Sequence, residues 1–187
     1  CLINSAGFTG AAMKKNNSNY FEKFEKYDFN LWQNSLNGNL SSTFIVTKLV
    51  GKHMLKRKKG SIINIASDYG VIAPDHRIYE ANKKFNYKGV SFNTPVSYSV
   101  AKSGIISMTK YLAAYWAKKG IRVNCISPAG IKKRHDKKFV EQLSQRIPLG
   151  RMANPTEFNG AIIYLCSNAS SFVTGHNLVI DGGKTIW

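Results

Sequence analysis

Four short apolar runs, separated by longer segments with helical periodicity, constrain the fold of this chain more than any other feature. The runs cover residues 1–4, 61–66, 121–126 and 177–180. Each is apolar at successive positions, as expected for a strand buried on both faces. Strands of this kind that alternate with helices form a parallel sheet with helices on two sides. We therefore predict an α/β fold.

Three helices are expected between these strands, over residues 32–57, over residues 98–118, and from Asn154 to about Ser167. Asn154 is suited to be the N-cap of the third helix, because a proline and then a glutamate follow at helical positions that favour them. The first helix has one face of apolar or small residues: Leu36, Leu40, Thr43, Thr47, Val50 and Met54. The second has a packed seam: Ala101, Ile105, Met108, Leu112 and Tyr115.

The net charge of +17 raises the question of nucleic-acid binding. Two basic clusters, residues 56–59 and 118–119, stand just before Gly60 and Gly120. Both resemble helix C-termini, where cations complement the helix dipole and glycine takes the left-handed position. This placement favours a solvated basic surface and no nucleic-acid partner. A functional site for a polyanion stays open as the alternative.

Cysteine usage and hydropathy limit the protein class further. The three cysteines, Cys1, Cys125 and Cys166, are scattered and odd in number. We interpret them as small buried hydrophobes in a reducing cytoplasm, with no disulfide and no metal site. The sequence has no run of about 18 or more apolar residues, so no membrane partner is expected.

Three polar side chains at the predicted carboxyl end of the sheet suggest proton-transfer chemistry. Ser67 directly follows the strand 61–66, and ligands of parallel sheets bind beyond such strand ends. Tyr98 and Lys102 are four residues apart and share a helix face. A lysine cation about 5–6 Å away favours the phenolate and lowers the tyrosine pKa. Such a tyrosine could exchange a proton with a substrate oxygen that the serine polarises.

Six segments make the chain similar to the classical short-chain dehydrogenases/reductases. YSVAKSGIISMTKYLAA, which begins at Tyr98, resembles the active-site helix of that family. The others resemble further family motifs in the same order: NSAG (4–7), NLSSTF (39–44), GIRVNCISPAG (120–130), LGRMANPTE (149–157) and TGHNLVIDGG (174–183). The likeness covers nearly the whole chain.

The resemblance implies a Rossmann-like doubly wound sheet, NAD or NADP as cofactor, and a homo-oligomer, either a dimer or a tetramer. It implies a catalytic set of Asn39, Ser67, Tyr98 and Lys102. In that set the Asn39 carbonyl would hold a water of a proton relay. It also implies a cofactor site formed by Tyr98 and Lys102 together with Asn4, Ala6, Gly7, Pro128, Ala129, Gly130 and Ile131.

The family also has a glycine-rich T-G-x-x-x-G-x-G turn within a βαβ unit, and this chain lacks it. We therefore expect residues 1–187 to form a single partial domain, the C-terminal and catalytic part of the fold. The turn would supply backbone donors to the cofactor pyrophosphate at a helix N-terminus. By itself the 187-residue chain is expected to be inactive.

The segment between Ser67 and Tyr98 is longer than is common in the family, and it should form a wall of the active site. It resembles the corresponding loop of bacterial family members that are associated with flagellin modification and surface-polysaccharide sugar pathways. Asp68, Arg77 and Tyr79 are the candidate substrate contacts, for a sugar or a sugar-derived substrate. An ordinary surface loop is the simpler reading. An extended-type sugar epimerase or dehydratase, and a polyanion binder without catalysis, are the alternative functions.

Overall fold

The computed structural model describes residues 1–7, 18–80, 93–133 and 135–187. Within them the strands form one sheet in the order β1-β2-β3-β4, and every neighbouring pair is parallel. The strands are β1 (Leu2–Asn4), β2 (Gly60–Ile65), β3 (Ile121–Pro128) and β4 (Asn177–Ile180). The predicted α/β class with a parallel sheet is confirmed.

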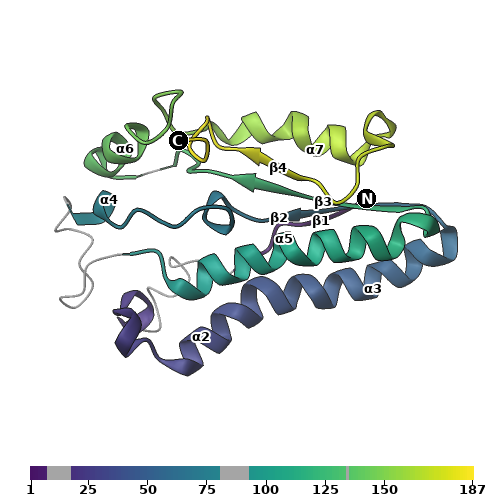
Figure 1. Ribbon diagram of the computed structural model, residues 1–187, viewed down its shortest axis with the longest axis horizontal. Coiled ribbons are helices and arrows are strands. Elements are labelled where there is room, and N and C mark those ends of the chain that lie inside the picture. Colours follow the sequence, from purple (N-terminus) through teal and green to yellow (C-terminus); the bar gives the residue numbers. More distant parts are fainter. Residues whose placement is uncertain (8–17, 81–92, 134) are drawn as a thin grey trace.

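Helices cover both faces of the sheet (Figure 1). One layer contains α2 (Phe29–Leu36), α3 (Ser42–Arg57) and α5 (Val96–Trp116), and a π-helical turn, Asn37–Ser41, joins α2 to α3. On the other face lies α7 (Asn159–Cys166), which follows the 3-10 turn Pro155–Phe158. Two short helices, α4 (Arg77–Glu80) and α6 (Lys137–Ser144), lie at the end of the molecule where α5 begins (Figure 1).

Short 3-10 helices complete the described elements. They are η1 (Ser18–Phe21), η2 (Phe24–Lys26), η4 (Asp68–Gly70), η6 (Ala117–Lys119) and η8 (Asn168–Ser170). Of these, η1 and η4 matter for function, because η4 directly follows β2 and η1 contributes aromatic side chains to the same end of the sheet.

The apolar runs of the central strands supply two cores, one on each face of the sheet. Successive side chains of a strand point to opposite faces. Ile62 on β2 packs with Val123 and Trp116 under α3 and α5, whereas its neighbour Ile63 packs with Leu165 of α7. Ile62, Ile63 and Val123 are fully buried. Burial on both faces explains why β2 lacks a regular polar alternation.

Several details differ from the sequence-based expectation. Tyr115, expected in the packed seam of α5, is 57% exposed, and Trp116 is buried in its place. The helix α3 ends with Lys58 in the left-handed conformation, and Gly60 instead begins β2. Gly60 is needed for space, because a Cβ there would collide with Met54. Cys1 is exposed, whereas Cys125 is buried as expected.

Candidate active site

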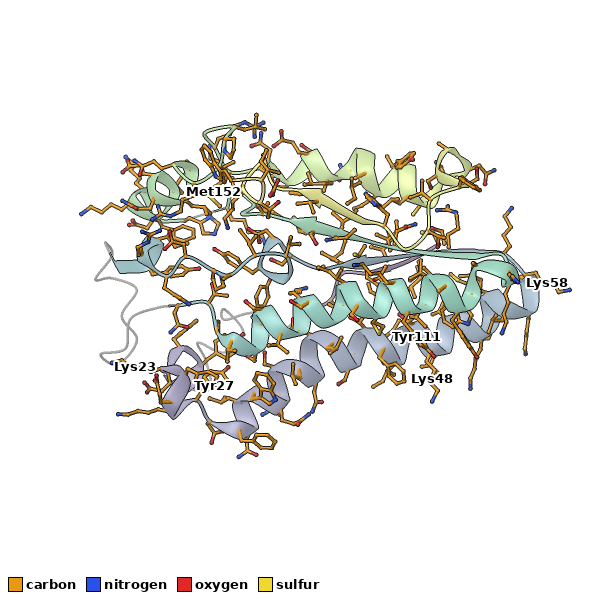
Figure 2. All side chains as sticks on the ribbon, viewed as in Figure 1. Lys23, Tyr27, Lys48, Lys58, Tyr111 and Met152 are labelled. Carbon is orange, nitrogen blue, oxygen red and sulfur yellow. The ribbon has the colours of Figure 1, made fainter. Side chains whose placement is uncertain are left out.

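A cavity of about 410 Å³ lies at the carboxyl ends of β2 and β3. Ser67, Tyr98 and Lys102 line it, together with the segment 128–131. A larger hollow of about 1040 Å³ lies at the opposite ends of the strands, near Gly60 and Ile121, and contains none of these groups. We assign the site to the smaller cavity, because ligands of parallel sheets bind at the carboxyl ends. Figure 2 shows Met152, which lines this cavity, at the end of the molecule opposite to Lys58.

Ser67 is fixed by the start of the turn η4. It follows β2 after one residue, has extended backbone angles, and caps η4 by accepting a hydrogen bond from the Tyr69 amide at 3.2 Å. Its hydroxyl donates to Asp68 Oδ1 at 2.8 Å. A serine hydroxyl has one proton and two lone pairs, so these two bonds fix its orientation.

Tyr98 and Lys102 lie on the first two turns of α5. Lys102 Nζ donates to the Ile65 carbonyl at 2.8 Å and lies 5.6 Å from the centroid of the Tyr98 ring. Burial lowers the pKa of Lys102 to about 8. Burial also raises the pKa of Tyr98, and a side-chain hydrogen bond with Ser67 opposes that rise. The expectation of a net lowered tyrosine pKa is therefore not met, because removal of the phenol from water outweighs its partners.

Asn39 lies in the π-helical turn between α2 and α3, and it is buried. Its side-chain amide donates to the Ser35 carbonyl at 2.9 Å, and its carbonyl accepts from the Thr43 hydroxyl at 3.0 Å. Single π turns inside helices are frequent at functional sites, because they shift the register of the backbone groups. The role of the Asn39 carbonyl in a proton relay stays a prediction.

The expected cofactor residues fall into two groups. Pro128, Ala129, Gly130 and Ile131 line the cavity. Ile131 forms a parallel bridge with Ala153, which uses the Gly130 carbonyl and the Lys132 amide. In a parallel bridge, the amide and carbonyl of the bridging residue itself point away from its partner. The backbone amide and carbonyl of Ile131 therefore take no part in the bridge to Ala153.

Asn4, Ala6 and Gly7 form the second group, and in the described part of the chain they are outside the residues that line this cavity. The Asn4 amide donates to Thr47 and to Asn64, both at 2.8 Å, which ties β1 to α3 and β2. Gly7 passes so close to Asn39 that a Cβ at Gly7 would lie 3.2 Å from the Asn39 Oδ1 atom.

The three expected substrate contacts have different surroundings. Tyr79 lines the cavity, donates to or accepts from the Thr94 hydroxyl at 2.9 Å, and stacks on Phe139. Asp68 also lines the cavity, but it is buried in an ion pair with Lys184. Arg77 is paired with Asp75 and its side chain is 76% exposed. Residues 81–92 of the expected loop lie outside the described residues.

Several residues of the cavity wall were missed by the sequence reasoning. Tyr69 lies two residues after Ser67, and this short separation is a signal from which the sequence could have identified it. The others come from distant elements that only the folded chain brings together: Tyr20, Phe21, His135, Phe139 and Lys184. Within the described residues no group of three or more His, Cys, Asp or Glu side chains could hold a metal ion. No helix in this described part of the chain is long and apolar enough to cross a membrane.

Comparison with known proteins gives two family matches. Residues 1–89 match the family model described as short chain dehydrogenase, and residues 86–185 match the one described as enoyl-(acyl carrier protein) reductase. A 2-dehydro-3-deoxy-D-gluconate 5-dehydrogenase of Bacillus subtilis is 35% identical, over 97% of this chain and 63% of that protein. A D-threitol dehydrogenase of Mycolicibacterium smegmatis is 34% identical, over 99% of this chain and 62% of that protein.

A solved structure supports the same assignment. The short-chain dehydrogenase of Leptospira borgpetersenii with bound NAD⁺ is 38% identical and superposes with a TM-score of 0.83, over 98% of this chain and 64% of that one. This similarity confirms the Rossmann-like class of the fold. The chain spans less than two thirds of the length of each of these three relatives. From its sequence and its fold alike, the chain belongs to the short-chain dehydrogenase family.

Proposed function

We propose that this chain carries the catalytic centre of an NAD(P)-dependent oxidoreductase that interconverts an alcohol and a carbonyl on a sugar-derived or polyol substrate. One observation carries the proposal. The hydroxyl of Ser67, which follows β2, converges with the Tyr98 phenol and the Lys102 ammonium of α5 in one cavity at the carboxyl end of a parallel sheet.

The cavity suits a nicotinamide ring beside this group. The backbone amide and carbonyl of Ile131 are the kind of donor and acceptor that a carboxamide needs, and Pro128 and Ala129 offer apolar contacts. Lys102 is within reach of a ribose hydroxyl, since its ammonium group lies in the cavity wall and donates one of its three protons to the Ile65 carbonyl. A bound nicotinamide would supply the hydride acceptor or donor.

In the proposed mechanism the protein manages the proton. The Ser67 hydroxyl, which donates its one proton to Asp68 in the structure, would turn that proton to the reacting oxygen when substrate binds. The Tyr98 phenolate takes the proton from an alcohol, and the Tyr98 phenol returns it to a carbonyl. Lys102 stabilises the phenolate while it exists, because its cation lies 5.6 Å from the ring centroid. Asn39 would hold a water that connects Lys102 to solvent.

The wall of the cavity supports a hydroxyl-rich substrate. Tyr79, Thr94 and Asn93 bring hydroxyl and amide groups to one side, and Phe21 and Phe139 bring aromatic faces. Sugars and polyols present such a mixture of hydroxyls and C–H faces. The two relatives named for a deoxy sugar acid and for a tetritol favour the same class. The link to flagellin modification or surface-polysaccharide pathways stays a prediction.

A homo-oligomer is part of the proposal. The outer surface of α3 and α5 exposes large apolar side chains: Phe44, Ile45, Leu49, Tyr111 and Tyr115. Figure 2 labels Tyr111 and Lys48 on this layer of helices. A second copy of the chain would cover this face through a two-fold, self-complementary contact, the usual arrangement in homo-oligomers.

The test is a direct assay of the full-length protein. It is mixed with NAD⁺ or NADP⁺ and a panel of polyols and sugar acids, and the absorbance of the reduced nicotinamide is followed. We expect reduction with at least one polyol or sugar acid. The proposal would be overturned by a folded protein that binds the cofactor but does not reduce it with any polyol or sugar acid of the panel. Epimerised product without net reduction would instead support the extended-type alternative.

A further inference from the structure

A buried ion pair joins the C-terminal end of the chain to the candidate active site. Lys184 follows β4 in the turn after Asp181, and its Nζ lies 2.6 Å from Oδ2 of Asp68. Both side chains are almost fully buried, with 6% and 5% of their surface exposed. Both also line the cavity that contains Ser67 and Tyr98. The pair is therefore part of the site wall and not a surface contact.

The carboxylate of this pair is bonded to the serine of the proposed mechanism. Asp68 Oδ1 accepts from the Ser67 hydroxyl at 2.8 Å and from the Tyr69 amide at 2.9 Å. Lys184 Nζ lies 4.1 Å from the centroid of the Tyr69 ring, so a cation–π contact holds it from a second side. Every atom of Asp68 that can bear charge is thus tied to the serine, to its turn or to the lysine.

An unpaired carboxylate at this position would oppose the proposed chemistry. The mechanism forms negative charge on the phenol of Tyr98 and on the substrate oxygen, and a buried like charge nearby disfavours both. The Lys184 cation compensates that charge at a distance where water cannot screen it. A buried carboxylate without a partner is also costly in itself.

We propose that Lys184 is a positioning residue of the active site, which neutralises Asp68 so that the carboxylate can hold the Ser67 oxygen in place without opposing the charge that forms on Tyr98. The proposal rests on the proposed function and deepens it. It assigns Asp68 to the support of the serine, in place of the substrate contact expected from the sequence.

The surroundings of Tyr98 set the sign of the expected effect. The titratable groups that line the cavity with it come from several elements: Tyr20 on η1, Asp68 and Tyr69 on η4, Tyr79 on α4, Lys102 on α5, His135 before α6 and Lys184 after β4. Burial and the Asp68 charge both raise the pKa of Tyr98. Loss of the lysine charge should therefore raise this pKa further, and loss of the aspartate charge should lower it.

The experiment compares the full-length wild type with three variants: Lys184→Met, Asp68→Asn and the double variant. The pH dependence of kcat/KM for alcohol oxidation reports the tyrosine on its acid limb. We expect Lys184→Met to move that limb up by about one pH unit, which is a roughly tenfold loss of kcat/KM at pH values below the limb. Asp68→Asn should move it down, and the double variant should return it close to the wild type.

Opposite shifts in the two single variants separate electrostatic positioning from a purely structural role, which would lower activity without moving the limb in opposite directions. Lys119→Met is the matched control, because Lys119 lies 4.9 Å from the Tyr115 ring centroid at the exposed far end of α5. It should leave the profile unchanged. If Lys184→Met does not fold, Asp68→Asn alone still tests the sign.

A second readout separates this inference from the proposed function. Ultraviolet titration of tyrosinate, taken as the difference between each variant and the same variant with Tyr98→Phe, follows the phenol without any turnover. We expect the same two opposite shifts there. An inactive wild type would overturn the proposed function alone. Profiles and titrations that do not move in either single variant would overturn the role of Lys184.

Discussion

Replacement of Tyr98 by phenylalanine should remove catalysis while it leaves the fold almost unchanged. The phenol is the group in the proposed mechanism that moves the proton, and a positioned general acid or base contributes about 10²–10⁴-fold in rate. That factor corresponds to about 3–5 kcal/mol of transition-state stabilisation. The side chain is half-buried, and its side-chain partner Ser67 keeps its bonds to Asp68 and to the Tyr69 amide when the phenol hydroxyl is removed. The free energy of unfolding should therefore change by about 1 kcal/mol or less.

The assay measures turnover by nicotinamide absorbance and stability by thermal unfolding on the same preparation of full-length protein. Tyr164→Phe is the control, because it also removes one tyrosine hydroxyl, from a residue on α7 that is 40% exposed. It should change neither turnover nor stability. Turnover of Tyr98→Phe within about threefold of the wild type would refute the assignment of the proton transfer, since a general acid or base contributes far more than that. A large loss of stability would refute the argument that the phenol is dispensable to the fold.

Three further outcomes are expected. Arg77→Ala should leave kcat/KM for the sugar-like substrate and the cofactor affinity within about twofold of the wild type, because the side chain is 76% exposed, is paired with Asp75 and is outside the described residues that line the cavity. A tenfold loss of kcat/KM would restore the substrate contact expected from the sequence. Gly51→Ala should lower the free energy of unfolding, measured by chemical denaturation, by about 1–3 kcal/mol, because the new Cβ would lie 2.6 Å from the Trp116 ring. Gly160→Ala is the control: its Cβ would meet open space in the described structure, so the free energy of unfolding should stay the same or rise. The full-length protein should be a dimer or tetramer by light scattering, and Leu49→Glu on the exposed α3 face should shift it toward monomer; a monomeric wild type would refute that proposal.

The sheet and its helices were predictable because they follow from local periodicity. Ile62 and Ile63 are both apolar because each faces a different helical layer. The apolar runs in the sequence therefore indicated strands that are buried on both faces. The convergence of Ser67 with Tyr98 was also predictable, since parallel strands bring their carboxyl ends to one edge. The short helix α6 was missed, because its eight residues lie in a segment with no motif and a strongly charged start.

The parts that escaped prediction depend on contacts between distant segments. Asp68 and Lys184 are 116 residues apart, and neither position alone indicates a partner. The pKa of Tyr98 was expected to fall because Lys102 lies four residues away, but burial of the phenol, which raises this pKa, is a property of the assembled wall. The Tyr115 side chain was misplaced because α5 turns its Trp116 ring toward Gly51 instead.

The transfer of hydride from the substrate carbon is the most direct test of the central claim. The full-length protein is given oxidised nicotinamide cofactor and a polyol or sugar acid that it oxidises, with deuterium at the carbon that bears the reacting hydroxyl. The account predicts that the deuterium appears on the nicotinamide ring by NMR, and that the transfer is lost in Tyr98→Phe. Deuterium released to water, or a deuterated nicotinamide formed at the same rate by the variant, would contradict it.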